Sequence, residues 1–594
     1  MKKIAIIDSG VRMDHPAFIN KEIRGFSLSF DRTGNIIKKY DFNDSIGHGT
    51  AIFYLISKFS PTSKITNIKI YDKNEYIDQE IFENILDYIC RETQFDIINI
   101  SMGLVMCGNT ARMQSICNEF HKKGTIIVSA FDNNGAVSFP AGLKNVIGVD
   151  GQENWKNQSK YILVHNSIVN IIGRIKNQKV AWLKPDYILV KGSSFVCAEV
   201  TAKIANSKHK NKIKILEEIC DGELELNVPF KKIMDYKIKY AAVFPFNKEV
   251  HALARYEMLL DFVISDFYHL RISGKIGKKI CDILPNCYNQ AVLKDIDEIN
   301  WNSFDTLILG HTDELSNITR MDYKKILTQK AIEKNKNIYC FDAYNLETCG
   351  QVDNNSKLYY PMITEKNIHV RFGKLYKTNK PILSIIGTNS KQGKFTLQLQ
   401  LRNMLIKLGY SIGQIGTEPS SLLFGMDESF PNGFNSQVNL KPEQICSIVN
   451  QMIWDISQKD VDIIITGCQS GLIAYNDRNI DMLPLGHQIF FEAIQPDAII
   501  LCINDFDEIS FVERTIKAAE GLSGGTVIGL VCFPLSTATG WSGTFGNRTR
   551  ISKARERIIK NKYKATLNKI VYMLDKPNEL NELLIKCLNY FQEK

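Results

Sequence analysis

The sequence predicts an α/β protein made of three units in series, each a parallel sheet covered by helices. Apolar, β-branched runs alternate with segments of helical periodicity along most of the chain, which is the pattern of parallel strands joined by crossover helices. The length of 594 residues is too great for one hydrophobic core. The hydrophobic and charged contents, 44% and 23%, are those of an ordinary globular protein. We expect units at 1–206, 238–378 and 379–594, with a linker at 207–237.

The first unit contains apolar runs that are typical of buried strands, at Lys2–Asp8, Lys64–Tyr71, Asp96–Ser101 and Thr125–Ala130. Helical periodicity is found at Ala51–Phe59, Ile77–Thr93 and Cys197–Ala205. The polar, basic stretch that follows has no periodic pattern, so we expect the unit to end there.

The other two units show the same alternation. In the second unit a helix is predicted at Val250–Phe262, and strands are predicted at Tyr240–Phe246, Tyr268–Ser273, Asp305–Gly310 and Asn337–Ala343. In the third unit, strands are predicted at Pro381–Ile386, Ile412–Gly416, Asp462–Thr466, Ala498–Ile503 and Val527–Phe533. The chain then closes with helices.

The composition disfavours several classes of function. A net charge of +9, without a basic block beside aromatic residues, predicts no nucleic-acid partner. No apolar run reaches the ~18 residues of a membrane span, and the apolar stretch before Asp8 is too short for a signal peptide. The 14 cysteines stand singly, which is typical of reduced core residues in a cytoplasmic protein. No metal site is predicted.

Three short motifs follow one another in the first unit: Asp8-Ser9-Gly10, Gly47-His48-Gly49-Thr50 and Gly192-Ser193-Ser194. A serine hydroxyl is a weak nucleophile, and a histidine can take its proton when a carboxylate fixes the histidine tautomer. Asp8 ends a predicted strand, where α/β sheets place functional groups. Ser194 precedes a helix, so its backbone N–H can donate to an oxyanion. Each motif alone is a common turn, but the three in this order predict a protease.

In these motifs the chain resembles the subtilisin-like serine proteases (subtilases) over roughly residues 1–206. The matching segments are Ile6–Gly10, Gly47–Thr50, Asn99–Gly103 and Gly192–Ala198. The resemblance implies that Asp8, His48 and Ser194 form a catalytic triad. It also implies that an extended substrate backbone pairs with the edge formed by Ser101, Met102 and Gly103.

The resemblance leaves the second donor of the oxyanion hole open. In subtilases an asparagine follows the strand that corresponds to Ile126–Ala130, and this chain continues as Phe131-Asp132-Asn133. Alignment without a gap places Asp132 at that position, and a shift of one residue places Asn133 there. An ionised carboxylate would repel an oxyanion, whereas an amide donates to it. We therefore expect either a neutral Asp132 or Asn133 in this role.

A glycine-rich loop opens the third unit, between a predicted strand and a predicted helix. Such a loop presents backbone N–H groups to phosphates, and its lysine reaches the outer ones. The loop is one residue longer than the standard P-loop, and a turn without a ligand is the alternative. The candidate residues for binding a phosphate-bearing ligand are Gly387, Thr388, Gly393, Lys394 and Thr396.

The third unit resembles the DUF1611 family of P-loop proteins, which have the same long loop, and the similarity continues through Asp462–Leu472 and Pro496–Asn504. The resemblance implies a Rossmann-like domain at 238–378. It also implies binding of ATP, with or without Mg²⁺, or of acyl-CoA. Cys468 stands where relatives often carry an acidic residue, which disfavours a firm hold on Mg²⁺.

A subtilase joined to a DUF1611-like region resembles proteins of bacterial peptide-maturation systems. This resemblance predicts a cytoplasmic serine endopeptidase that needs no cofactor for proteolysis, cleaves a ribosomally made precursor or leader peptide, and works beside peptide-modifying enzymes. Two alternatives remain. In one, the C-terminal half is a nucleotide- or acyl-CoA-dependent transferase or ligase, and the first unit only binds peptide. In the other, the chain is a scaffold that gathers precursor and modifying enzymes.

Overall fold

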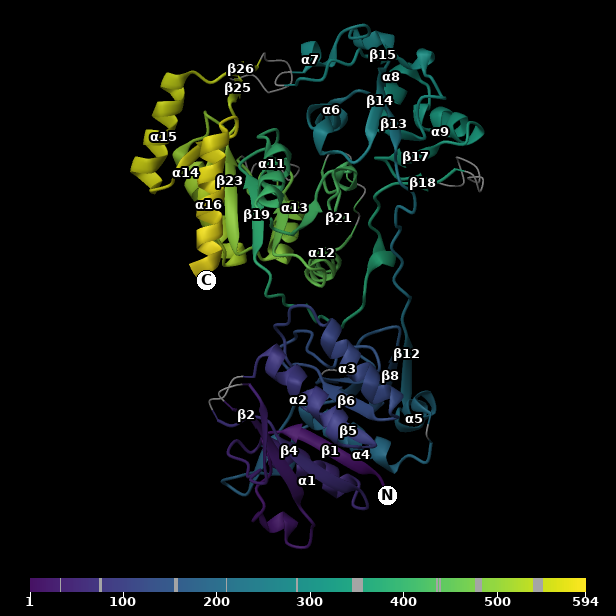
Figure 1. Ribbon diagram of the computed structural model, residues 1–594, viewed down its shortest axis with the longest axis vertical. Helices are drawn as coiled ribbons and strands as arrows, with labels where there is room; N and C mark the ends of the chain where they lie inside the picture. Colours follow the sequence, from purple (N-terminus) through teal and green to yellow (C-terminus); the bar gives the residue numbers. More distant parts are fainter. Residues whose placement is uncertain are drawn as a thin grey trace. The chain divides into compact units, whose positions relative to one another are not determined.

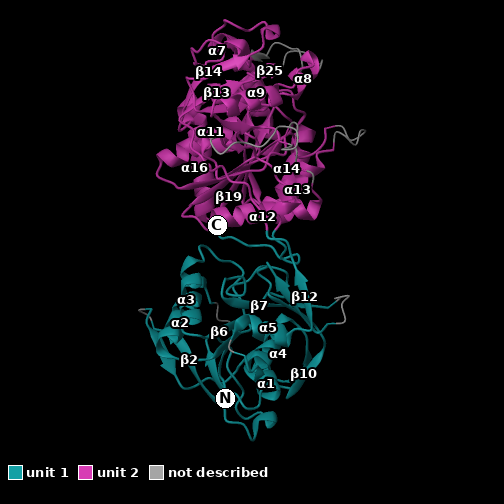
Figure 2. Cartoon of the chain, turned by 90° about the vertical axis from the view of Figure 1, so that its right-hand side faces the viewer, with its two compact units in different colours: residues 1–228, 369–379 teal, residues 229–368, 380–594 magenta. Residues whose placement is uncertain are grey.

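The chain folds into two compact units (Figure 2). Unit 1 contains Met1–Val228 and His369–Asn379, and unit 2 contains Pro229–Ile368 and Lys380–Lys594. No helix in the part of the chain that the structure describes is long and apolar enough to cross a membrane. This computed structural model describes residues 1–31, 34–73, 77–153, 159–209, 211–284, 287–344, 356–433, 436, 438, 440–475, 483–537 and 548–593.

Unit 1 is built on a 10-stranded sheet with the order β12-β8-β9-β7-β6-β5-β1-β4-β2-β3. Its centre is parallel, with β1 between β4 and β5 and with β6 next to β5. The strands are β1 (Lys3–Asp8), β2 (Arg24–Phe30), β3 (Ile36–Lys39), β4 (Lys64–Lys69), β5 (Ile97–Ile100), β6 (Ile126–Ala130), β7 (Val146–Gln152), β8 (Tyr161–His165), β9 (Ile171–Arg174) and β12 (Gly222–Glu225). A separate hairpin is formed by β10 (Gln178–Ala181) and β11 (Tyr187–Val190).

Helices cover both faces of this sheet (Figure 2). On one face α1 and α4 contact each other and share a core with Ile4 and Ile6, which point to the same side of β1. On the other face α2 and α3 pack together. The helices are α1 (His48–Phe59), α2 (Gln79–Glu92), α3 (Ala111–Lys122), α4 (Ser193–Asn206) and α5 (Lys212–Ile219).

Unit 2 contains two parallel sheets (Figure 1). The first has the order β15-β14-β13-β16-β17-β18. Its strands are β13 (Tyr240–Phe244), β14 (Val263–His269), β15 (Lys294–Asp295), β16 (Thr306–Leu309), β17 (Asn337–Cys340) and β18 (Leu358–Tyr359). Its helices are α6 (His251–Arg255), α7 (Ile280–Ile283), α8 (Asp313–Thr319) and α9 (Tyr323–Glu333).

The second sheet of unit 2 has the order β21-β20-β22-β19-β23-β24-β27. Its strands are β19 (Ile382–Gly387), β20 (Ile412–Gly416), β21 (Glu428–Ser429), β22 (Ile463–Gly467), β23 (Ala498–Ile503), β24 (Thr526–Cys532) and β27 (Val571–Met573), and a hairpin is formed by β25 (Leu535–Thr537) and β26 (Arg548–Arg550). One face packs on α11 (Lys394–Lys407) and α16 (Pro577–Glu593). The other face packs on α12 (Pro442–Ser457), α13 (Leu485–Ile494), α14 (Ile509–Ser523) and α15 (Lys553–Leu567).

The sheets confirm the predicted α/β class, but two predicted elements are wrong. The helix expected at Val250–Phe262 ends after α6, and the strand expected at Tyr268–Ser273 is instead β14, which ends at His269. After α6 the chain forms a short 3-10 helix at Glu257–Leu259, and β14 then begins at Val263, which lies opposite Tyr240 of β13. The apolar residues after Phe262 therefore extend the sheet rather than a helix.

The stretch expected as a linker at 207–237 is partly built into unit 1. It contains α5, whose apolar side joins the core of unit 1, and β12, which extends the sheet by pairing with β8. A later segment, His369–Asn379, also belongs to unit 1, although the residues on both sides of it belong to unit 2.

Candidate active site

Asp8 lies at the carboxyl end of β1, in the middle of the unit 1 sheet, and only 1% of it is exposed. Its carboxylate is surrounded by donors. The backbone N–H of Ser9 donates to Oδ1 at 2.8 Å, the Ser9 hydroxyl donates at 3.3 Å, and the Tyr71 hydroxyl donates at 3.2 Å. A buried charge is tolerated when it is hydrogen-bonded in this way.

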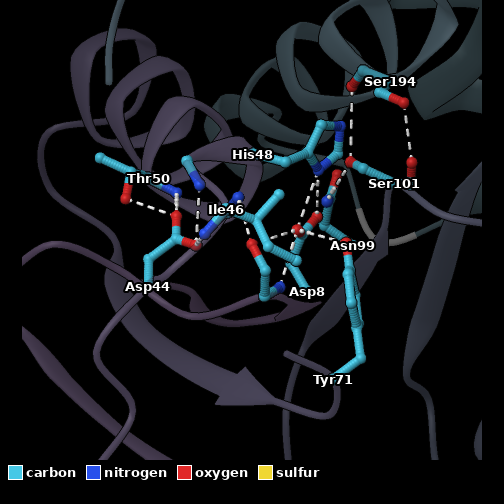
Figure 3. A network of polar contacts seen from close by, with 12 residues as sticks. Asp8, Asp44, Ile46, His48, Thr50, Tyr71, Asn99, Ser101 and Ser194 are labelled. Atoms are coloured by element: carbon cyan, nitrogen blue, oxygen red, sulfur yellow. Dashed lines mark hydrogen bonds and ion pairs between the residues drawn. The ribbon is translucent and has the colours of Figure 1, made fainter. Parts of the chain in front are cut away.

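His48 is the first residue of α1 and contacts Asp8 directly (Figure 3). Its Nδ1 lies 2.8 Å from Asp8 Oδ1 and 3.0 Å from Oδ2. The turn before it requires glycine, because Gly47 has φ of +104° and a Cβ there would come within 2.5 Å of the Trp182 ring. The loop is also held by Asp44, whose carboxylate accepts from the backbone N–H groups of Gly47 and Thr50 at 2.9 Å.

The surroundings of His48 change its pKa in two directions. Burial disfavours the charged imidazolium, whereas the charge and hydrogen bond of Asp8, and more weakly the charge of Asp44, favour it. The net result is a raised pKa. This contact leaves Nε2 as the nitrogen that can accept a proton from a nucleophile.

Ser194 lies in the first turn of α4, and Gly192 precedes that turn with φ of +146°, a conformation that favours glycine. The Ser194 hydroxyl donates to the carbonyl oxygen of Ser101 at 2.7 Å, and the Ser101 hydroxyl donates back to the carbonyl oxygen of Ser194 at 3.4 Å. Asn99 supports this contact from β5, since its Nδ2 donates to the Ser101 hydroxyl at 2.8 Å.

The imidazole of His48 lies between Asp8 and Ser194 (Figure 3). The ring centroids of His48 and Phe195, the residue after Ser194, are 5.7 Å apart. Among the described residues no hydrogen bond joins His48 to the Ser194 hydroxyl, which is directed at Ser101. Proton transfer therefore requires the hydroxyl to turn from Ser101 toward the ring.

The predicted substrate edge follows β5. Ser101 is buried, and Met102 and Gly103 are half-buried. Glycine is required at 103, because a Cβ there would lie 2.7 Å from the Cβ of Ser138. The next residue, Leu104, forms an antiparallel bridge with Phe139.

The loop after β6 places the two oxyanion candidates differently. The Asn133 side chain lies against the serine turn, where its Oδ1 accepts from the backbone N–H of Ser193 at 2.8 Å. The Asp132 carboxylate instead accepts from the backbone N–H of Asn134 at 2.7 Å. Asn133 is thus the candidate that contacts the residue before Ser194.

The glycine-rich loop of unit 2 connects β19 to α11 and is tightly structured by its own side chains. Gln392 is fully buried, donates to the Thr388 hydroxyl at 2.6 Å and accepts from the backbone N–H of Asn389 at 3.0 Å. The Lys394 ammonium donates to the Asn389 carbonyl oxygen at 2.6 Å, and burial lowers its pKa. Gly393 has φ of +75° and a Cβ there would meet Leu574 at 2.5 Å.

A cavity of about 360 Å³ lies beside this loop. One wall is formed by the loop with Lys394 and Thr396, and another by Lys248, His251 and Arg255 at the start of the Rossmann-like part of unit 2. The buried Nε2 of His251 has no hydrogen-bond partner, and no hydrogen bond or ion pair is made by Arg255 within the described residues. The unpartnered guanidinium of Arg255 favours an anionic ligand.

The sequence analysis did not identify the residues that support the site from distant positions in the chain. Asp44 and Tyr71 support the Asp8–His48 pair, but neither belongs to a recognisable motif. In unit 2 the buried His311 Nδ1 lies 2.6 Å from Asp342 Oδ1. The only signal for this pair is that both residues follow adjacent strands, β16 and β17, at the same edge of the sheet.

Unit 1 is thus a parallel α/β domain in which Asp8 contacts His48 and Ser194 lies in the first turn of a neighbouring helix. Residues 2–219 match the subtilase family, and residues 369–521 match the P-loop domain of DUF1611, a domain of unknown function. Both resemblances are thus confirmed, and the chain carries an N-terminal subtilase domain and a C-terminal DUF1611 P-loop domain.

Curated relatives match the N-terminal part. A thermophilic serine proteinase of Bacillus sp. (strain AK1) is 25% identical over 240 residues, which cover 37% of this chain and 55% of the relative. Thermitase of Thermoactinomyces vulgaris is 26% identical over 188 residues, which cover 28% of this chain and 61% of the relative. The chain thus spans little more than half the length of these relatives.

Solved structures with related folds were found for both parts of the chain. A cold-adapted subtilisin-like serine proteinase is 18% identical, and the match covers 36% of this chain and 79% of the proteinase, with a TM-score of 0.29. A prenylagaramide maturation protease is 18% identical, with 34% and 74% covered and a TM-score of 0.27. A DUF1611 family protein from Anabaena variabilis is 12% identical, with 60% and 100% covered and a TM-score of 0.43.

Proposed function

We propose that unit 1 is a serine endopeptidase with Asp8, His48 and Ser194 as its triad. The observation that carries the proposal is the buried Asp8 carboxylate 2.8 Å from His48 Nδ1, with Ser194 on the other side of the imidazole (Figure 3). This contact fixes the tautomer in which Nε2 accepts the serine proton. The raised pKa of His48 strengthens that nitrogen as a base.

The proposed reaction has two steps. Ser194 Oγ attacks the scissile carbonyl carbon while its proton passes to His48 Nε2, and the tetrahedral oxyanion is held by the backbone N–H of Ser194 and the Nδ2 of Asn133. His48 then gives the proton to the leaving amine as the C–N bond breaks. Water hydrolyses the acyl-enzyme through the same base. The substrate backbone pairs with the edge at Ser101–Gly103.

The test is covalent labelling of the purified full chain with a fluorophosphonate probe, read by mass spectrometry. We expect one adduct on Ser194 and none in Ser194→Ala or His48→Ala. His165→Ala, at a partly exposed histidine outside the site, is the matched control and should label like the wild type. A wild-type protein that stays unlabelled while folded overturns the proposal and favours a unit that only binds peptide.

The proposed substrate is a ribosomally made precursor or leader peptide rather than proteins in general. Support comes from the joining of a subtilase domain to a P-loop domain in one chain, which suits a dedicated task. Incubation with a set of unrelated denatured proteins should give few cleavages, whereas rapid digestion of all of them would contradict this selectivity.

A second candidate function belongs to unit 2, which we propose binds a phosphate-bearing ligand. The supporting observation is the cavity between the glycine-rich loop and α6, into which Lys394 and the unpartnered Arg255 contribute cationic groups. The loop N–H groups would hold the phosphates, and Arg255 would contact their outer oxygens. Glu418 also lines the cavity, and burial raises its pKa, which favours the neutral acid beside an anion.

Calorimetric titration with ATP and Mg²⁺, and separately with coenzyme A, tests this second function. We expect binding of one of the two by the wild type and a loss of about tenfold or more in affinity in Lys394→Ala, since the lysine supplies charge-assisted hydrogen bonds. Lys407→Ala, at the exposed far end of the same helix, is the control. Equal affinities in wild type and Lys394→Ala would refute a phosphate cradle.

A further inference from the structure

Unit 1 contains a short segment from outside its subtilase match. His369–Asn379, here called the strap, packs on unit 1, although the residues on both sides of it belong to unit 2. The subtilase match ends at residue 219, so the strap is no part of what that family describes. Returning a chain to a domain after a long excursion costs conformational entropy, and specific contacts must offset it.

Hydrogen bonds hold the strap to unit 1 at two places. The Ser167 hydroxyl donates to the carbonyl oxygen of Val370 at 2.9 Å. Further along, the backbone N–H of Val137 donates to the carbonyl oxygen of Leu375 at 2.9 Å. The backbone N–H of Leu375 donates to the carbonyl oxygen of Gly135 at 3.3 Å. Gly135 and Val137 belong to the loop that carries Asn133, so the strap pairs with the oxyanion loop.

The strap also contributes one side chain to a buried ion pair. Lys374 Nζ lies 2.9 Å from Asp150 Oδ1, and the two side chains are only 6% and 3% exposed. Lys374 Nζ also lies 5.6 Å from the centroid of the Phe131 ring. Two charges withdrawn from water need each other, so removal of either leaves an uncompensated buried charge. This pair therefore differs from an exposed surface ion pair, which contributes little.

Asp150 in turn contacts the turn that carries the nucleophile. The Ser193 hydroxyl donates to Asp150 Oδ1 at 3.4 Å, the same oxygen that faces Lys374. The backbone N–H of Gly151 donates to the Ser193 hydroxyl at 3.1 Å. Ser193 is thereby held on one side by β7 and on the other by Asn133, and Ser194 is the next residue.

We propose that the strap is a positioning element of the protease site, with Lys374 as its positioning residue. Lys374 acts through Asp150 and Ser193 on the turn that carries Ser194, and Leu375 fixes the loop that carries Asn133. The proposal rests on the proposed protease function. It makes the competence of the subtilase domain depend on residues that lie beyond a large part of unit 2 in the sequence.

Substitution of Lys374 in the full-length chain tests this role. In Lys374→Met we expect the rate of Ser194 labelling at saturating fluorophosphonate to fall about tenfold or more, because small displacements of a nucleophile are costly. The pH midpoint of labelling should not change, since it reports the pKa of His48, which Lys374 does not contact. Lys374→Arg keeps the charge and should recover most of the rate. Lys377→Met, at an exposed lysine of the same strap, should label at the wild-type rate.

A second variant keeps the test decisive if Lys374→Met does not fold. The double variant Lys374→Met with Asp150→Asn buries no charge in this pair, so it should fold and still label slowly, because nothing then ties the strap to the serine turn. Labelling at the wild-type rate in a folded Lys374→Met or double variant overturns the positioning role. An unlabelled wild type contradicts the protease function itself, which is a different result.

Discussion

At the scale of single residues, the site is organised around one buried carboxylate. Asp8 accepts hydrogen bonds from Ser9 and Tyr71 on one side and faces His48 on the other. Burial and the neighbouring charge of Asp8 raise the pKa of Tyr71, so its hydroxyl stays a donor at neutral pH. These donors keep the buried carboxylate oriented toward the imidazole and satisfy its hydrogen-bonding oxygens.

The raised pKa of His48 predicts the pH dependence of labelling. Only the neutral imidazole accepts a proton, so the rate should rise with pH around a midpoint above the ordinary value of 6.5. In Asp8→Asn the attraction that raises the pKa is gone and burial acts alone, so the midpoint should drop below the wild-type value while the maximal rate falls steeply. An unchanged midpoint in Asp8→Asn would contradict the assigned cause.

The raised pKa of His48 also makes the stability of the protein depend on pH. Because the pKa of His48 is higher in the folded state, its pairing with Asp8 contributes to the free energy of unfolding at pH values below the ordinary 6.5. That contribution is lost as the pH rises through the folded-state pKa. Denaturant titrations of wild type and His48→Gln at low and high pH measure it, and the difference between the two proteins should shrink as the pH rises.

Substitution of the two oxyanion candidates should affect the reaction rate to different extents. Asn133→Ala should lower the maximal labelling or cleavage rate by about 10²–10³, equivalent to roughly 2.7–4 kcal/mol of lost oxyanion stabilisation. Asp132→Ala should change the rate little, because that carboxylate contacts the backbone of Asn134 instead of the serine turn. Substrate binding should be nearly unaffected in both. A large loss in Asp132→Ala alone would reverse the assignment.

Sequence motifs identify residues of this kind only when the chemistry is local. Asp8, His48 and Ser194 each stand in a glycine- or serine-rich turn after a recognisable element, and the structure places the first two in contact. Asp44 and Tyr71 stand in no such pattern, and their roles arise from tertiary contacts. The choice between Asp132 and Asn133 likewise depends on a loop conformation that the sequence does not specify.

At the scale of elements, long buried strands were predictable because hydrophobic runs specify them. β20 and β23 coincide with the predicted ranges, and the four strands predicted in unit 1, which are β1, β4, β5 and β6, differ by one or two residues at their ends. The prediction failed after α6, where a short 3-10 helix at Glu257–Leu259 replaces the second half of the predicted helix before β14 begins at Val263.

Glycine before α1 gives a testable prediction at this scale. Gly47→Ala combines a left-handed φ of +104° with a Cβ 2.5 Å from Trp182, so the free energy of unfolding should fall by more than the ~1–2 kcal/mol that left-handed strain alone costs. Ser194 labelling should fall as well, because His48 is the next residue. Gly34→Ala is the matched control, with φ of +83° and open space around the new Cβ.

In Gly34→Ala the free energy of unfolding should fall only by the cost of the left-handed strain, and Ser194 labelling should be unchanged. Denaturant unfolding measures both losses. Equal losses in the two variants would show that the Trp182 contact does not hold the turn.

At the scale of the whole molecule, the sequence predicts successive α/β domains but not the strap. Nothing in the local pattern of 369–379 indicates that it leaves unit 2, because the partner of Lys374 is Asp150, in a distant strand. The prediction of a linker at 207–237 was wrong in part for the same reason, because the partners of this stretch are also distant in the sequence. β12 is short and polar, and it is a strand only through pairing with β8.

Two units with separate cores predict separate responses to ligands in thermal unfolding. A ligand that binds only the folded form stabilises it by about 2.7 kcal/mol at a concentration of one hundred times its Kd. ATP with Mg²⁺, or coenzyme A if that is the ligand bound, should therefore raise the transition of unit 2 and leave that of unit 1 in place. Lys394→Ala should abolish the shift, and Ser194→Ala should retain it.

The transitions can be assigned with the covalent probe. A fluorophosphonate adduct on Ser194 should move only the unit 1 transition, because Ser194 and His48 both belong to that unit. A single transition that shifts with either ligand would show that the two units unfold as one cooperative block. In that case Lys374→Met should separate the transitions, because Lys374 ties a segment flanked in sequence by unit 2 to the core of unit 1.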